Sequence, residues 1–246
     1  MLQSLKKIYG AKLHASDGDI GKISDFYFDD QSFAIRYLVA DTGSWLSGRQ
    51  VLLAPNSFGR LDLEEAVLPV QLTRQQIEGS PGIALHRPVS RQYEEDYHSY
   101  YGWPYYWTAD VVFGFGGSIP SPETAVLAEE AREEQHLRDN QHLQSTRSIT
   151  GYAIEDNDGT IGHVRDFLVD ETTWVIQHVE VETGHWYAGK EILISTDRIT
   201  RISYGESKVH VNLTKADIER TGEHHIARAE SMEHYSSVGS SPFTNR

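Results

Sequence analysis

The sequence contains no cysteine among its 246 residues. This absence excludes disulfides, thiolate metal sites and a cysteine nucleophile. No run approaches the roughly 20 apolar residues that a membrane-spanning helix needs. Residues 1–7 also lack the continuous apolar stretch of a secretory signal. We therefore expect a cytoplasmic protein without membrane insertion.

Positive charge is scarce as well. Lys and Arg number 22 against 36 Asp and Glu, which gives a net charge of −14 and a pI near 5.2. Binding to a phosphate backbone needs clustered Lys and Arg side chains, and the sequence contains no such cluster. We therefore expect neither nucleic acid nor an anionic membrane surface as a partner.

Two stretches of the chain are related by a constant shift of 141 residues. Placing residue n against residue n+141 aligns Ser4–Glu78 with Ser145–Glu219 without a gap, and about 23 of the 75 pairs are identical. A long-period self-similarity of this kind predicts a tandem duplication of one small domain. We call residues 1–82 repeat 1 and residues 144–221 repeat 2. The shared motifs include Asp-Gly-x-Ile-Gly at 17–21 and 158–162, and Thr-Gly-x-Trp-x-x-Gly at 42–48 and 183–189.

Short strands separated by turn residues fill each repeat. Asp17-Gly18 lies before the run Ile20–Phe28 and predicts a hairpin. A Thr cap at Thr73 with Gln76 three residues later predicts a short final helix. We therefore expect a mainly β chain of two closed antiparallel barrels, each ending in a short helix. The other expected strands of repeat 1 are Ala34–Ala40, Gln50–Ala54, Ser57–Asp62 and Ala66–Val70.

An ordered series of framework residues runs through both repeats. In repeat 1 it consists of Gly10, Asp17-Gly18-x-Ile20-Gly21, Asp25-Phe26-x-Phe28, Arg36–Val39, Trp45, Val51–Pro55 and Leu72-Thr73. The series resembles the PRC-barrel family, named for the H subunit of the photosynthetic reaction centre. The resemblance implies two PRC-barrel-like domains without naming a partner. It also implies a binding role, since the family includes a protein-binding barrel in a ribosome-maturation factor.

Residues 83–143, between the repeats, differ in composition from both. We expect a linker made of an aromatic and Gly-rich segment followed by a helical spacer that opens at Ser121-Pro122. The aromatic side chains could pack against the barrels, form a self-association or partner surface, or build a cage for a cation or small ligand. The polar tail, residues 222–246, is expected to be disordered. The aromatic residues are Tyr97, Tyr100, Tyr101, Trp103, Tyr105, Tyr106 and Trp107.

Trp45 and Trp186 occupy equivalent positions in the two repeats, in a loop flanked by glycines. Each indole could cover one end of its barrel or mark a contact surface, between the repeats or with a partner. Together with Tyr100, Tyr101, Trp103, Tyr105, Tyr106 and Trp107, they are the predicted interaction residues.

The sequence contains no recognisable catalytic motif. It has no Gly-x-Ser-x-Gly elbow, and the glycines at 114–117 lack the Lys-Ser/Thr of a phosphate loop. The paired carboxylates Asp25/Asp166 and Asp29/Asp170 favour hydrogen bonding in turns and across strands over acid–base chemistry. We therefore expect no enzyme and no catalytic residue, with a hydrolase that uses these carboxylates as a distant alternative.

Histidine is frequent, at 12 residues, but no His-x-x-x-His pair of a helical zinc site occurs. We expect no cofactor and no metal. The sequence predicts a non-enzymatic protein-interaction or scaffolding module that forms a homodimer and binds an unidentified protein. The alternative is a small-ligand or metal sensor that uses the His-rich repeat 2. Its histidines are His163, His178, His185 and His210, which stand where repeat 1 has Lys22, Tyr37, Ser44 and Pro69.

Overall fold

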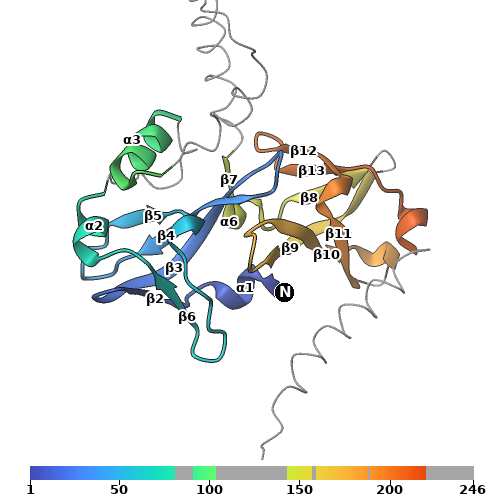
Figure 1. Cartoon of the computed structure of the whole chain (residues 1–246). Coiled ribbons are helices and arrows are strands. Elements are labelled where there is room, and N and C mark those ends of the chain that lie inside the picture. Colours follow the sequence, from blue (N-terminus) through green and yellow to red (C-terminus); the bar gives the residue numbers. More distant parts are fainter. Residues whose placement is uncertain (81–90, 104–142, 157–158, 188, 220–246) are drawn as a thin grey trace, which may run out of the picture. The chain divides into compact units, whose positions relative to one another are not determined.

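The chain folds into two compact units, each built on a β sheet. The computed structural model describes residues 1–80, 91–103, 143–156, 159–187 and 189–219 (Figure 1). We call residues 7–147 the N-unit, and residues 1–6 together with 148–246 the C-unit. The expected spacer helix, the glycines at 114–117 and the tail at 222–246 lie outside the described residues.

The N-unit holds a six-stranded sheet in the order β5-β4-β3-β2-β6, with β7 paired to β3. Its strands are β2 (Lys12–Ala15), β3 (Gly18–Asp29), β4 (Ile35–Asp41), β5 (Gln50–Leu53), β6 (Val67–Val70) and β7 (Leu143–Ser145). Its helices are the 3-10 turn η1 (Pro55–Ser57), α2 (Arg74–Glu78) and α3 (Arg91–Tyr101).

The C-unit holds a seven-stranded sheet in the order β11-β10-β9-β8-β13-β12, with β1 paired to β9. Its strands are β1 (Leu2–Ser4), β8 (Ala153–Asp156), β9 (Gly159–Asp170), β10 (Ile176–Thr183), β11 (Glu191–Ser195), β12 (Ile199–Ser203) and β13 (Lys208–Val211). Its 3-10 turns are η3 (His185–Tyr187) and η4 (Thr196–Arg198). Two short helices, α1 (Leu5–Ile8) and α6 (Thr146–Ile149), contain the points at which the chain passes from one unit to the other.

Local sequence signals were good predictors of local structure. The Asp17-Gly18 turn joins β2 to β3 as expected. The capping box also forms, since Thr73 accepts a hydrogen bond from the Gln76 amide while the Gln76 side chain caps Thr73. The strand expected at Ser57–Asp62 was wrong, because this stretch forms η1 and isolated bridges. Pro69 of the adjacent strand β6 has no N–H to donate, so a continuous ladder between β6 and residues 57–62 cannot form.

The sheets differ from closed antiparallel barrels in two respects. Strands β2 and β6 pair in parallel, as do β8 and β13. In addition, no pairing among the described residues joins the two edges of either sheet. The reason lies in the connection after β5, which carries the chain across to the far edge, where β6 lies beside β2 and points the same way.

Alternation along the strands gives each sheet a buried inner face. In the N-unit this face includes Phe26, Leu38 and Leu53. Leu38 lies in the middle and pairs with Phe26 on one side and with Leu53 on the other. The inner residues at equivalent C-unit positions are Phe167, Val179 and Ile194, also buried. The two units therefore conserve the apolar character of one sheet face while the opposite, outer face is free to differ.

The first strand of each repeat lies in the sheet of the other repeat. Strand β1, from repeat 1, pairs with β9 of repeat 2, and β7, which opens repeat 2, pairs with β3 of repeat 1. The two pairings have the same register once the shift of 141 residues is applied. The partners are Leu2↔Asp170, Gln3↔Val169 and Ser4↔Leu168 in the C-unit, and Leu143↔Asp29, Gln144↔Phe28 and Ser145↔Tyr27 in the N-unit.

An aspartate carboxylate holds each exchanged strand, Asp166 being buried and Asp25 partly exposed. In the C-unit, Asp166 accepts hydrogen bonds from the Ser4 hydroxyl, the Lys6 amide (3.1 Å) and the Phe167 amide (2.8 Å). In the N-unit, Asp25 plays the same part toward Ser145 (2.5 Å) and the amides of Arg147 (3.2 Å) and Phe26 (2.7 Å). The hydrogen-bonding role predicted for this pair of aspartates is confirmed.

The second predicted pair, Asp29 and Asp170, caps turns. Asp29 accepts from the amides of Gln31 and Ser32, and Asp170 accepts from those of Thr172 and Thr173. The bonds from Thr173 and Thr172 hold the pKa of Asp170 below its usual value. These carboxylates are thus structural, ionised acceptors.

Candidate functional site

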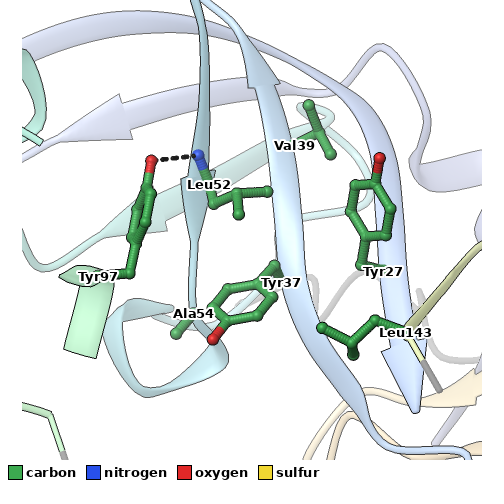
Figure 2. Close-up of a cluster of buried hydrophobic side chains, with 7 residues drawn as sticks. All are labelled: Tyr27, Tyr37, Val39, Leu52, Ala54, Tyr97 and Leu143. Atoms are coloured by element: carbon green, nitrogen blue, oxygen red, sulfur yellow. Dashed lines mark hydrogen bonds between the residues drawn. The ribbon is translucent and has the colours of Figure 1, made fainter. Parts of the chain in front are cut away.

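The outer sheet face of the N-unit is covered by helix α3. Five side chains of β3, β4 and β5 or their ends form this face and are all buried. Figure 2 shows them together with Tyr97 from α3 and Leu143 from the exchanged strand β7, which belong to the same apolar cluster. The five residues are Tyr27, Tyr37, Val39, Leu52 and Ala54.

Tyr97 anchors α3 through both its hydroxyl and its ring. Its hydroxyl accepts a hydrogen bond from the Leu52 amide at 3.1 Å (Figure 2). Strand β5 is at the edge of the sheet order, so this hydroxyl satisfies a backbone donor of an edge strand. The Tyr97 ring also lies 6.3 Å from that of Tyr37. The helix therefore both buries apolar surface and completes the backbone hydrogen bonding of the sheet.

A polar network lies beneath α3. The Tyr37 hydroxyl donates to Glu94 Oε1 at 3.1 Å, and His98 Nε2 lies 3.0 Å from the same hydroxyl oxygen. Glu94 is 2% exposed and His98 is 4% exposed. Because Tyr37 gives its proton to the carboxylate, His98 acts as the donor through Nε2–H. Two polar residues of α3 thus converge on one tyrosine of the sheet, which fixes the helix in a single orientation.

Replacement of Tyr97 by phenylalanine is expected to destabilise the chain by about 1–3 kcal/mol, because the Leu52 amide loses its acceptor in a buried setting. Urea denaturation monitored by circular dichroism measures this loss. Tyr100→Phe is the matched control, since its hydroxyl bonds the Gln76 carbonyl at 2.8 Å on a side chain that is 44% exposed. Its expected cost is about 0.5 kcal/mol or less. Equal costs for the two variants would contradict the anchoring role of Tyr97.

The described part of the predicted aromatic segment continues this packing. Tyr101 and Trp103 stack at 4.3 Å with an interplanar angle of 14°, and the Trp103 ring also meets His98 edge-on. Burial raises the pKa of Tyr101. Tyr100, Tyr101 and Trp103 thus gather at the covered face, with Tyr100 at its exposed margin. Tyr105, Tyr106 and Trp107 lie outside the described residues.

The equivalent outer face of the C-unit is partly exposed. At the positions of Tyr37 and Val39 it carries His178 and Glu180, so two buried residues are replaced by polar ones. All five members have intermediate exposure, whereas all five in the N-unit are buried. We call this surface the repeat 2 face. Its members are Leu168, His178, Glu180, Leu193 and Ser195.

Glu180 makes the repeat 2 face acidic at its centre. Burial, together with the nearby carboxylates Glu191 and Asp166, raises the pKa of Glu180. Lys6 and Arg165 act in the opposite direction and lower this pKa in part. The Arg165 guanidinium is shared, since it lies nearer to Glu191 (2.8 Å) and Glu182 (3.0 Å) than to Glu180 (3.6 Å).

This shift predicts a pH-dependent effect of Glu180→Gln. A carboxyl group whose pKa is raised by folding costs stability once pH exceeds that raised pKa, and costs nothing below its unfolded pKa. The variant should therefore melt higher than the wild type at pH 7, with the difference vanishing near about pH 3.5. Thermal scans from acid to neutral pH measure it. Glu182→Gln, at a side chain 57% exposed on the same strand, controls for the loss of one partner of Arg165.

Trp45 and Trp186 both lie under a cation. The Arg74 guanidinium is 4.7 Å from the centre of the Trp45 ring, and the Lys215 ammonium is 5.6 Å from that of Trp186. Arg74 and Lys215 are equivalent residues, and each begins the helix that ends its repeat, at residues 74–78 and at the described residues 215–219. Trp186 also donates from Nε1 to the Ile161 carbonyl at 2.6 Å. Both indoles are partly exposed, so each is contacted by a cation of its own unit and remains partly accessible to solvent.

The histidines of repeat 2 lie on different elements. His163 is on β9, His178 on β10, His185 in η3 and His210 on β13. Within the part of the chain that the structure describes, no three His, Asp or Glu side chains are grouped so as to hold a metal ion. Their positions therefore lend no support to a shared ligand site.

Sequence reasoning missed three elements of this arrangement. They are the residues Glu94 and His98 under α3, the exchange of the first strands, and the contrast between the two outer faces. The contrast could have been noticed from the pairs Tyr37/His178 and Val39/Glu180, since an outward position that changes from apolar to charged implies a different neighbour.

These features define a mainly β protein in which two sheets share one strand order, β5-β4-β3-β2-β6 matching β11-β10-β9-β8-β13. Residues 145–218 match the family model of the PRC-barrel domain. The chain therefore contains a PRC-barrel domain, which coincides with repeat 2. A search of the curated proteins finds no match. None of the helices in the described ranges has the length and apolar character needed to cross a membrane.

Proposed function

We propose that this chain is a non-enzymatic protein-interaction module that self-associates and binds a partner protein through the repeat 2 face. The observation that carries the proposal is the contrast between two equivalent sheet faces. One is buried under α3, whereas the other remains partly exposed. The apolar side chains of this face favour a covering partner, and the Glu180 carboxylate can be covered favourably only by a partner that supplies a cation.

The chemistry of the face indicates the kind of partner. In the N-unit the helix supplies the carboxylate, Glu94, and the sheet supplies the tyrosine. In the C-unit the carboxylate Glu180 is on the sheet itself, so a complementary helix must bring a cation to it. The apolar side chains Leu168 and Leu193 on either side favour an amphipathic helix. The proposed occupant is therefore a partner helix with an Arg or Lys among apolar residues.

Site-specific photo-crosslinking in the native host tests this assignment. A benzophenone amino acid replaces Leu193 on the repeat 2 face, and the matched control places it at Glu206, a side chain 54% exposed on the β12–β13 turn of the same unit. The expected result is an adduct at Leu193 with one recurring protein, mapped by mass spectrometry to a basic amphipathic helix. Glu180→Lys should abolish that adduct.

Three outcomes would contradict the proposal. They are adducts of equal yield at Glu206, an adduct at Leu193 that maps to an acidic or unstructured peptide, and an adduct that is unaffected by Glu180→Lys.

A further inference from the structure

The two exchanged strands have the same sequence. Strand β1 is Leu2-Gln3-Ser4 and β7 is Leu143-Gln144-Ser145. Each pairs antiparallel, in the same register, with the end of a twelve-residue strand. A strand that adds to a sheet edge gains affinity from its main chain and specificity from alternate side chains. Neither strand therefore carries a feature that restricts it to one of the two acceptors.

The acceptors share their aspartate contacts, although in the N-unit the Thr146 hydroxyl adds a bond to Asp25 at 3.0 Å that its equivalent, Leu5, cannot make. Asp166 and Asp25 each accept from the serine of the incoming strand and from the amide two residues further on, at Lys6 or Arg147. Each also accepts from the amide of the following phenylalanine on its own strand. We call these two acceptors the strand sockets. Each recognises an extended Leu-Gln-Ser segment, and its contacts are unchanged whichever chain supplies that segment.

We propose that two copies of this chain associate by exchanging these strands, so that β1 of one copy occupies the β9 socket of the other. The inference rests on the self-association included in the proposed function and names its contact. An exchanged dimer makes the same socket contacts as the single chain, which is why exchange is a low-cost route to dimers.

The expected concentration range follows from the same equality. Since the contacts are the same, the balance between pairing within a chain and pairing between chains depends on concentration. The two become comparable when the chain concentration approaches the effective concentration of the tethered strand, on the order of millimolar for a flexible tether. A scaffold that gathers copies of the chain would bring them toward this range. At lower concentration the exchanged dimer is a minor species that a covalent trap can accumulate.

The absence of native cysteine makes such a trap clean. A chain carrying Gln3→Cys is mixed with a mass-tagged chain carrying Val169→Cys, because residues 3 and 169 are direct partners in the ladder. Under mild oxidation, mixed dimers are measured on non-reducing gels and by mass spectrometry. The control replaces the second chain by one with Tyr204→Cys, a position that is 59% exposed in the same unit, whereas Val169 is fully buried.

Strand exchange predicts that the buried cysteine at residue 169 reacts faster than the exposed cysteine at residue 204, which is the reverse of what exposure alone would give. The dimer linking residues 3 and 169 should form on the order of tenfold faster than the one linking residues 3 and 204, since a disulfide requires Cα atoms within about 7 Å. A faster reaction at residue 204, or equal rates at residues 169 and 204, overturns the inference.

Sedimentation of the wild-type chain separates this result from the proposed function. Association that rises from about 10 μM to about 1 mM supports exchange when the trap also succeeds. If the wild type associates while the trap fails, the exchange contact is wrong and self-association stands. Adducts at Leu193 test the other part of the proposed function and do not depend on the strand sockets.

Discussion

Asp166→Ala is expected to destabilise the chain by at least about 3 kcal/mol, because three hydrogen bonds to one charged acceptor are lost together. The carboxylate is 3% exposed, so water cannot replace it for Ser4 or Lys6. Such a loss is a large share of a total stability of about 5–15 kcal/mol. Denaturant unfolding measures it, and hydrogen exchange should show that residues 2–4 of β1 lose protection before β9 does.

Asp197→Ala, at an exposed residue of η4 in the same unit, is the matched control and should change stability by about 0.5 kcal/mol or less. A second comparison uses Asp25→Ala, which removes the equivalent carboxylate from the N-unit. It should expose the amides of residues 143–145 rather than those of residues 2–4. Loss of protection at residues 2–4 in the Asp25 variant would contradict the assignment of each socket to one strand.

Gly162→Ala is the second substitution with a large expected effect, about 3 kcal/mol or more, of the size caused by forced displacement of packed backbone. A Cβ atom at residue 162 would lie 2.2 Å from the Glu182 carbonyl oxygen. Because both are main chain, the clash is relieved only by separating β9 from β10. Calorimetry measures the fall in melting temperature. Gly21, the equivalent glycine, has the same close approach at 2.0 Å to the Asp41 carbonyl oxygen.

Gly205→Ala provides the control for Gly162→Ala. Nothing lies within 4 Å of a Cβ atom at residue 205, so the expected change is about 0.5 kcal/mol or less. Similar melting temperatures for the two variants would show that β9 and β10 are not packed as closely as described.

Local features of the fold could be predicted from the sequence because their causes are local. Asp17-Gly18 suits a tight turn by its backbone alone, and Thr73 caps a helix by a bond to a residue three positions away. The constant shift of 141 residues likewise identified equivalent positions without any structure. The two sheets share their strand order, as expected of strands at equivalent positions.

The strand exchange could not be predicted, and the reason is physical. Leu2-Gln3-Ser4 and Leu143-Gln144-Ser145 are identical, and both sockets present an aspartate in the same register. Either strand can form the ladder and the serine–aspartate bond in either sheet, so pairing rules leave the choice open. What decides the pairing is chain connectivity in three dimensions, which periodicity and propensity do not contain.

Helix α3 shows a different limit. The aromatic residues of this segment could be recognised in the sequence, but they were predicted to lie in a linker, with three alternative roles. Two of the residues that dock the helix, Glu94 and His98, are polar and carry no apolar signal. Their burial depends on Tyr37, which is more than fifty residues earlier in the chain. A buried polar network of this kind is specified by tertiary contacts rather than by local pattern.

The most direct test of the exchanged architecture is an intrachain disulfide in the full chain. The double variant Gln3→Cys/Val169→Cys, oxidised at low concentration, should give a monomer whose digest contains a peptide linking residues 3 and 169. The comparison is Gln3→Cys/Phe28→Cys, because Phe28 is the equivalent of Val169 within repeat 1 and would face Gln3 if β1 paired with its own repeat. The structure predicts a disulfide in the first variant and none in the second. A disulfide between residues 3 and 28 would contradict it.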